Sequence, residues 1–464
     1  MNPQSNTSRV PGANTALPLV KESPPALKRV MGTTSLVLFG LAYMVPMTIF
    51  TTYGLVTTLT EGHLPAAYAV TLAAMMFTAF SYAFLVKVVP SAGSAYSFTQ
   101  RIFGGHLGFI TGWTLMLDYL LLPLINYLLI GIYLNAQFPA IPLWAFTSAA
   151  IVLVTVLNVV GLTVVRSANL VLVGAQAVFV VVFVALALAK VPTGSSLIEP
   201  MFSASMSPEL IMAGAAILCL SFLGFDAVST MSEEARDPLR TVPRAIILTT
   251  LFGGAVFILV SWVSHLVHPD WQSFTDPDAA AIEIMEGIGG QLLTAFFLAA
   301  YVAGATASAM ASQASVSRIL FAMGRDGVLP RRVFGQINIK FRTPVGAILV
   351  VSMISLLALV VDLETVAAVV SFGALFAFSL VNLGAIKYFL VDGGMRRPAH
   401  ILKYGVVPGI GFVLTVWLWF SLSGSAMMLG LAWAGAGVLY LVFLTRGFRI
   451  APPRVALDET DVAG

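Results

Sequence analysis

Two aspartates lie inside long apolar runs of this sequence, where a carboxylate is least expected. Asp118 lies in GWTLMLDYLLLPLIN (residues 112–126), and Asp226 lies in SFLGFDAVST (residues 221–230). A charged acid at the centre of a membrane helix costs about 2.5–3.5 kcal/mol, so it needs a partner, a proton or a function. No lysine or arginine occurs at comparable depth in any apolar run. The counter-charge is therefore expected to be a bound cation, a proton or a sodium ion; the alternative is a protonated acid hydrogen-bonded to the backbone.

The residues that follow Asp118 predict a surface rich in hydrogen-bond acceptors. Pro123 cannot donate to the carbonyl of Tyr119, so that carbonyl is left free inside the run. Tyr119 and Asn126 are seven residues apart and share a helix face, with Asp118 beside it. A carboxylate, an amide, a phenol and a free carbonyl together suit the binding of an ammonium group.

Two apolar runs contain helix-breaking residues at corresponding positions. In FGLAYMVPMT (residues 39–48), Pro46 frees the carbonyl of Ala42, and in residues 221–230 Gly224 adjoins a charge. Broken helices at matching positions of two halves commonly mark a solute-binding site near the midplane of the bilayer, because irregular backbone at that depth is tolerated only around a cavity. A single such residue would indicate an ordinary kink, so the prediction depends on the matched pair. The candidate ligands in these runs are Ala42, Tyr43, Met44, Thr48, Phe222 and Phe225.

Other polar residues are weaker candidates. Ser312 and Gln313 lie at helical spacing with Ser308 and Ser315 in one apolar run, where small and hydroxyl residues also serve as ordinary helix-packing contacts. Glu233 and Glu234 follow the second broken run, close to several arginines. We expect these two glutamates to form a gate, a coupling site or structural ion pairs.

The composition predicts an all-α integral membrane protein. Hydrophobic residues make up 58% of the chain and charged residues only 10%, against about 25% charged residues in a soluble domain. The first 30 residues are polar and proline-rich, which predicts a disordered cytoplasmic tail. Cys219 is the only cysteine, so neither a disulfide nor a cysteine-based metal site is expected. Long apolar runs predict about twelve spans, at residues 34–59, 65–89, 106–134, 143–160, 167–189, 208–231, 243–267, 291–320, 344–361, 364–390, 403–421 and 425–445.

Basic residues are distributed unevenly among the loops that join these runs. With the N-terminus placed in the cytoplasm, Lys190 is the only one of the 24 lysines and arginines on the outer side. The positive-inside rule therefore predicts that both termini are cytoplasmic. Many acidic residues, by contrast, fall on the outer side. This predicts either an outer vestibule that concentrates cations or ordinary solvated loops. The outer acids are Glu61, Glu199, Glu209, Asp270, Asp276, Asp278, Glu283, Glu286, Asp362 and Glu364.

Three segments resemble signature motifs of the amino acid–polyamine–organocation transporter superfamily. They are PSAGSAY (residues 90–96), EEARDP with VPRAI (residues 233–238 and 242–246) and GRDGVLP (residues 324–330). The resemblance covers essentially the whole chain. Within the superfamily the chain is most similar to bacterial putrescine importers, through residues 40–43, 46–48, 117–119, Pro123, 221–228 and 276–280.

The resemblance implies a transport core of residues 31–390, built from two inverted five-helix repeats (residues 31–189 and 208–390), and two further helices within residues 391–464. It implies import driven by the proton motive force, with alternating access to a site between the first, third, sixth, eighth and tenth helices. It implies no enzymatic activity and no cofactor. The expected partners are a small amine such as putrescine, protons and the lipid of the bacterial inner membrane, and not a nucleic acid.

Two departures from the family pattern bear on the substrate and on the mechanism. Amino acid transporters of the superfamily usually have a Gly-x-Gly turn that holds the substrate carboxylate, whereas this chain has GLAYM at residues 40–44. The missing turn and the added acid Asp226 favour an amine without a carboxylate. Some proton-coupled relatives have a lysine in the fifth helix, where this chain has only Asn169 and Gln176 as comparable polar groups, so the proton carrier is not identified.

The length of putrescine sets a spacing for its ligands. Its nitrogens lie roughly 6 Å apart when extended, so with contacts of about 2.8 Å at each end its acceptors must lie roughly 12 Å apart. We expect Asp226 to bind one ammonium and Asp118, with Tyr119 or Asn126, to bind the other. The remaining contacts are expected from the carbonyls near Ala42 and Tyr43 and from the ring of Phe222.

Other functions are weighed against this hypothesis. The main alternative is a proton-coupled permease for a cationic or neutral amino acid, and a passive channel is a further one. A membrane enzyme is disfavoured because the sequence has no His–Asp–Ser set, metal-ligand cluster or phosphate-binding loop at membrane depth. The membrane potential contributes about 2.3 kcal/mol per charge per 100 mV, so proton symport and uniport both remain open for a dication.

Overall fold

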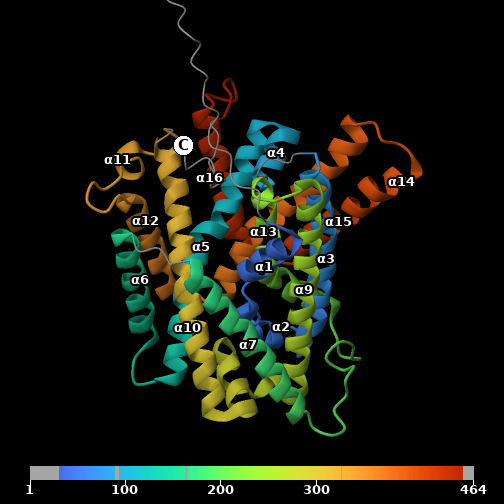
Figure 1. The fold of residues 1–464 in the computed structure, drawn as a ribbon, viewed down its shortest axis with the longest axis vertical. Coiled ribbons are helices and arrows are strands. Elements are labelled where there is room, and N and C mark those ends of the chain that lie inside the picture. Colours follow the sequence, from blue (N-terminus) through green and yellow to red (C-terminus); the bar gives the residue numbers. More distant parts are fainter. Residues whose placement is uncertain (1–30, 89–93, 162–165, 326, 453–464) are drawn as a thin grey trace, which may run out of the picture.

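The chain folds into a bundle of long helices in a computed structural model (Figure 1). The structure describes residues 31–88, 94–161, 166–325 and 327–452. The tail expected at residues 1–30 lies outside the described residues, as do residues 90–93 of the PSAGSAY motif. Within those ranges the only extended pairing is an isolated bridge between Met31 and Ala235, so the expected all-α class is confirmed.

Ten helical segments among the described residues are long and apolar enough to cross a membrane. The two remaining predicted runs, 167–189 and 344–361, contain the shorter apolar helices Gly174–Lys190 and Val345–Leu359. The ten segments are Thr33–Thr51, Leu64–Val86, Gly105–Gln137, Leu143–Val160, Pro208–Ser232, Pro238–Val267, Pro277–Arg325, Leu363–Asp392, Pro398–Phe420 and Gly424–Leu444.

The first apolar run is broken where the sequence predicts. It comprises α1 (Thr33–Met44), η1 (Pro46–Thr51) and α2 (Tyr53–Leu59). Val45, at the end of α1, has a φ of 53°, in the left-handed region. Pro46 follows it and has no N–H to continue the α-helical ladder. The hydroxyl of Thr48 donates to the carbonyl of Met44 at 2.9 Å and so satisfies one carbonyl that the break leaves open.

The sixth apolar run is broken in the same manner. It comprises α8 (Pro208–Leu218), η2 (Cys219–Phe222) and η3 (Ala227–Glu233). Gly224 lies in the turn between the last two elements with a φ of 125°, which side chains rarely tolerate. A Cβ atom added there would lie only 3.0 Å from the backbone nitrogen of Met44 and 2.8 Å from the ring of Tyr43. The two broken runs therefore touch at their breaks.

The remaining helices enclose these two runs. α5 (Gly105–Gln137) packs against α10 (Ala280–Arg325) and α13 (Leu363–Ile386), while α3 (Leu64–Val86) packs against α9 (Pro238–Val267) (Figure 1). The other elements are α4 (Ala95–Phe103), α6 (Leu143–Val160), α7 (Arg166–Lys190), η4 (Trp271–Ser273), η5 (Pro277–Ala279), α11 (Arg331–Phe334), α12 (Val345–Ser355), η6 (Leu356–Leu359), η7 (Lys387–Asp392), α14 (Pro398–Ile401), η8 (Leu402–Val406), α15 (Val407–Phe420) and α16 (Gly424–Leu444).

Aromatic rings fix η1 against two of these helices. Phe50 is 1% exposed, and its ring meets Phe183 of α7 at 5.2 Å and Phe297 of α10 at 5.4 Å between centroids. Both pairs are edge-to-face, the arrangement that the ring quadrupoles favour. The η1 segment, which follows the first break, is thus packed against both α7 and α10.

A buried polar network joins α6, α10 and α12. The side-chain oxygen of Gln313 accepts from Asn158 at 2.7 Å, and its amide nitrogen donates to the hydroxyl of Ser352 at 2.8 Å. Thr155 shares a further hydrogen bond of 2.7 Å with Ser352. Since each polar group has a partner, the network holds the three helices in one register.

Candidate functional site

A narrow cavity of about 80 Å³ lies where the first broken run meets α5, α7 and α10. Leu220 and Leu223 of the sixth run complete its wall. Most of the lining is apolar, and a few polar groups converge on it, as in small-molecule sites generally. The polar lining residues are Tyr43, Thr48, Thr51, Asp118, Asn126, Gln176, Tyr301 and Ser308.

Asp118 is the acidic residue of this cavity. Its Oδ1 atom is buried and has no hydrogen-bond partner among the described residues. Leu122, Ile125 and Leu129 of α5 line the cavity with it, so one side of this helix forms a wall of the site. A buried carboxyl group with an oxygen that lacks a hydrogen-bond partner suits a cationic ligand.

Asn126 lies eight residues further along α5 and also lines the cavity. Its side-chain nitrogen donates to the carbonyl of Leu122 at 2.8 Å and to the hydroxyl of Ser308 in α10 at 3.2 Å. Because the nitrogen is used in these two bonds, the orientation of the amide is fixed. Pro123 lies between these residues in the helix, as the sequence shows.

Asp226 lies beside the cavity and does not line it. Its Oδ1 atom accepts from the backbone N–H of Gly224 at 3.1 Å, so the carboxyl group stabilises the turn of the sixth run. It is also close enough to Asp118 for the two groups to interact electrostatically. The structure thus brings the two predicted acids together, but only one of them reaches the cavity.

The first broken run supplies three of its four predicted ligands. Tyr43, Met44 and Thr48 line the cavity, whereas Ala42 does not. Val45, Met47 and Thr51 extend this wall.

The other predicted ligands lie away from the cavity lining. Phe222 and Phe225 are fully buried: the first packs against Phe257 at 5.5 Å, and the second packs between Tyr82 at 5.7 Å and Phe378 at 5.3 Å. Their rings are part of the helix packing.

Three polar candidates are also placed elsewhere. Tyr119 packs against the buried core and does not join Asp118 at the cavity. The hydroxyl of Ser312 donates to the carbonyl of Ser308 within α10 at 2.7 Å. Gln313 is fully buried in the network between α6 and α12, so its polar atoms face away from the cavity.

The cavity contains polar residues that sequence reasoning did not name as ligands. Gln176 of α7 is 3% exposed, and Tyr301 of α10 shares a hydrogen bond of 2.9 Å with Thr51 of η1. Tyr301 and Ser308 are seven residues apart and share a helix face. That spacing was a usable signal, since Ser308 belongs to the polar series already singled out.

The segment that follows η3 is joined to the start of the first run. The N–H of Met31 donates to the carbonyl of Glu234 at 3.0 Å, and the N–H of Arg236 donates to the carbonyl of Met31 at 3.0 Å. The side chain of Glu233 lies outside the described residues. The broken runs are therefore connected at this end as well as at their breaks, and a gate or coupling role for Glu233 and Glu234 stays a prediction.

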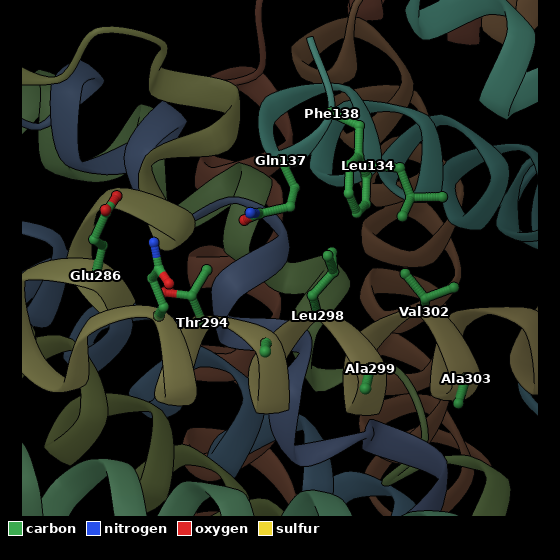
Figure 2. Close-up of a pocket in the computed structure, with 11 residues that line it drawn as sticks. Leu134, Gln137, Phe138, Glu286, Thr294, Leu298, Ala299, Val302 and Ala303 are labelled. Carbon is green, nitrogen blue, oxygen red and sulfur yellow. The ribbon is translucent and has the colours of Figure 1, made fainter. Parts of the chain in front are cut away.

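A larger cavity of about 540 Å³ lies between the last turn of α5 and one face of α10 (Figure 2). Gln137, Glu286 and Thr294 lie toward one end of it, and Leu298 and Val302 toward the other. None of its lining residues belongs to a broken run. Its lining includes the Glu286 carboxylate, but none of the predicted site residues.

Comparison with known proteins identifies the family of the chain. A family model described as amino acid permease matches residues 35–445. The chain belongs to the amino acid permease family. This permease is thus an integral membrane protein of a transporter family and not an enzyme, and the expected superfamily membership is confirmed.

The permease has relatives with different substrates. It is 40% identical to the low-affinity putrescine importer PlaP of Escherichia coli (strain K12), over 92% of this chain and 96% of the relative. It is 27% identical to the branched-chain amino acid permease BcaP of Bacillus subtilis (strain 168), over 90% and 93% of the two chains. The methylthioribose transporter of the same organism is 25% identical, over 91% and 94%.

Proposed function

We propose that this permease imports putrescine across the bacterial inner membrane. The observation that carries the proposal is the Asp118 carboxyl group, which is buried at a narrow cavity beside the broken helices and has an oxygen without a hydrogen-bond partner among the described residues. A cationic solute supplies the missing counter-charge. The similarity to a putrescine importer over nearly the whole chain supports the same conclusion.

The spacing of the polar groups fits a diamine. Asp118 and Asn126 are eight residues apart on α5, which corresponds to about 12 Å along the helix. Putrescine requires roughly 12 Å between its acceptors, including contacts of about 2.8 Å at each end. We assign one ammonium to the Asp118 carboxyl group, which lies near that of Asp226. We assign the other ammonium to the part of the cavity lined by Asn126 and Ser308, whose hydrogen bond joins α5 to α10.

An α-amino acid fits this site less well. Its carboxylate needs N–H donors, and the break of the first run offers few, since Pro46 has no N–H and the GLAYM stretch has no glycine pair. A carboxylate would also be repelled by the two acids. The narrow cavity suits an unbranched chain, which favours a linear amine over a branched amino acid.

The proposal includes the arrangement of the permease in the membrane. We assign two inverted five-helix repeats, residues 31–189 and 208–390, because a broken run opens each of them. α15 and α16 lie outside this core. We also assign both termini to the cytoplasm, which the distribution of basic residues supports. We assign the driving force for import to the proton motive force.

The test is uptake of radiolabelled putrescine into proteoliposomes that contain the purified permease. We expect saturable uptake that excess diamine inhibits and that amino acids do not, and that an imposed proton gradient accelerates at a fixed membrane potential. Inhibition mainly by α-amino acids would replace the proposal with an amino acid permease. Equal rates with and without the proton gradient would remove proton symport and leave uniport.

A further inference from the structure

The side-chain carbonyl of Gln176 in α7 lies at the narrow cavity that Asp118 lines and has no hydrogen-bond partner among the described residues. Its Oε1 atom is buried without a hydrogen-bond partner among the described residues, and the residue is 3% exposed. Native proteins rarely leave such a group unpaired. Because Gln176 lines the cavity, the natural partner is an N–H group of a molecule bound there.

Gly304 of α10 makes room for this amide. A Cβ atom added to Gly304 would overlap the Nε2 atom of Gln176, so any side chain there would displace the amide. The backbone of Gly304 has no positive φ that would itself require glycine. Glycine in the interior of a helix is unfavourable relative to alanine, and at Gly304 the missing side chain leaves room for the Gln176 amide.

The position of Gln176 along the cavity follows from two contacts between α5 and α10. Asn126 is hydrogen-bonded to Ser308, and the ring of Tyr133 meets that of Tyr301 at 4.7 Å. Residue numbers therefore rise along α5 as they fall along α10, so the helices are antiparallel. Gly304 thus lies beyond Ser308 on the side away from Asp118.

The distance from Ser308 to this end of the cavity is one further helical turn. Four residues separate Ser308 from Gly304, which is about 6 Å along the helix. The cavity is thus longer than the span from Asp118 to Asn126, which already matches putrescine. An aminopropyl arm, with four bonds of about 1.5 Å each in a zigzag, adds roughly 5 Å to a linear amine.

We propose that the Gln176 end of the cavity binds the third nitrogen of a linear triamine, so that the site accepts spermidine as well as putrescine. The inference rests on the proposed amine site at Asp118. Gln176 accepts a hydrogen bond from the terminal ammonium through Oε1, and Gly304 leaves the space that its amide occupies. The hydrogen-bonded pair of Tyr301 and Thr51 lies one turn further along α10 and lines the cavity too.

The test is competition binding by spermidine, putrescine and butylamine to the purified permease, with Gln176→Leu compared to the parent protein. We expect the dissociation constant for spermidine to rise about 10-fold, as for the loss of one hydrogen bond to a charged group. The constants for putrescine and butylamine should change less than about 2-fold on the same scale. Gly304→Ala should act in the same direction, because its Cβ displaces the amide.

A variant that is expected to bind spermidine more tightly separates a specific effect on binding from a loss of folded protein. Gln176→Glu places a carboxylate at the third nitrogen and should tighten spermidine binding about 10-fold without tightening putrescine binding. Gln137→Leu, in the cavity of Figure 2, is the matched control and should leave all three amines unchanged.

The outcomes separate this inference from the proposed function. Failure of spermidine to compete in the parent protein would overturn the inference, and so would equal losses for all three amines in Gln176→Leu. In both cases putrescine binding by the parent protein would leave the diamine proposal intact. Absence of putrescine binding in the parent protein would instead remove the proposed function.

Discussion

Asp118→Asn removes the negative charge of the cavity while keeping the size of the side chain. The carboxylate has an oxygen with no protein partner among the described residues, so the substrate ammonium is assigned to it. Truncation of one partner of a buried charge pair costs about 2–5 kcal/mol. A loss of about 3 kcal/mol corresponds to a dissociation constant for putrescine that is roughly 150-fold higher.

The same variant has a distinctive effect on stability. In the empty protein the buried carboxyl group is a cost, since an acid at the centre of a span is unfavourable by about 2.5–3.5 kcal/mol. We therefore expect the melting temperature of the Asp118→Asn permease without substrate to be unchanged or higher. Loss of affinity together with retained stability is the signature of a residue selected for function.

The assay combines putrescine binding to the purified permease with thermal unfolding in the same detergent. Asp270→Asn, an exposed acid with the identical change, serves as the control and should leave both quantities unchanged. A dissociation constant for putrescine within about three-fold of the parent value would refute the assignment of the ammonium to Asp118. A lower melting temperature with a proportionate loss of binding would indicate a structural role.

Three further substitutions test separate parts of the site. Asp226→Asn should greatly weaken putrescine uptake while the protein remains folded in the membrane; uptake near the parent rate would remove Asp226 from the site. Gly224→Ala forces a Cβ against Met44 at a positive φ, so thermal unfolding should show a loss of about 2 kcal/mol or more, and an unchanged melting temperature would contradict the tight contact. Gln313→Leu leaves Asn158 without its acceptor and should lower the unfolding free energy by about 1–2 kcal/mol, yet leave the KM for putrescine unaltered; a raised KM with normal stability would restore Gln313 as a ligand.

The helix breaks were predictable because their causes are local. Pro46 lacks an N–H whatever surrounds it, and Gly224 occupies a positive φ that other residues avoid. The apolar runs are local signals too, since about twenty consecutive apolar residues match the thickness of a bilayer. The helical fold and the region of the site were therefore predictable from these features.

The orientation of side chains around the breaks was not predictable in the same way. In a regular helix the sequence spacing determines which residues share a face. At a break, the orientation of the next segment depends on how it packs against its neighbours. Phe225 and Asp226 both lie in the irregular turn itself, where helical spacing does not apply, and neither reaches the cavity. Asp118 and Asn126 lie within the continuous helix α5 and line the cavity, whereas Tyr119, which the spacing placed on the face of Asn126, does not.

Gln176 and Gln313 show the limit of reasoning from residue type. Both are amides in apolar helices, and sequence gives no reason to prefer one as a ligand. Gln313 finds Asn158 and Ser352 on neighbouring helices, whereas the oxygen of Gln176 finds no partner in the part of the chain that the structure describes. The distinction depends on contacts with helices distant in sequence, and the glycine opposite Gln176 becomes informative only once α7 and α10 are placed together.

The placement of the two acids connects substrate binding with the broken helices. Asp118 belongs to α5, which is continuous, while Asp226 anchors the turn of the sixth run through the N–H of Gly224. That turn also lies close to the backbone of Met44 in the first run. An ammonium bound at Asp118 would therefore attract the nearby Asp226 carboxyl group, which is part of the turn that contacts the first run, while α5 stays fixed. A neutral solute of the same shape lacks this effect, because its binding leaves the repulsion between the two acids unchanged.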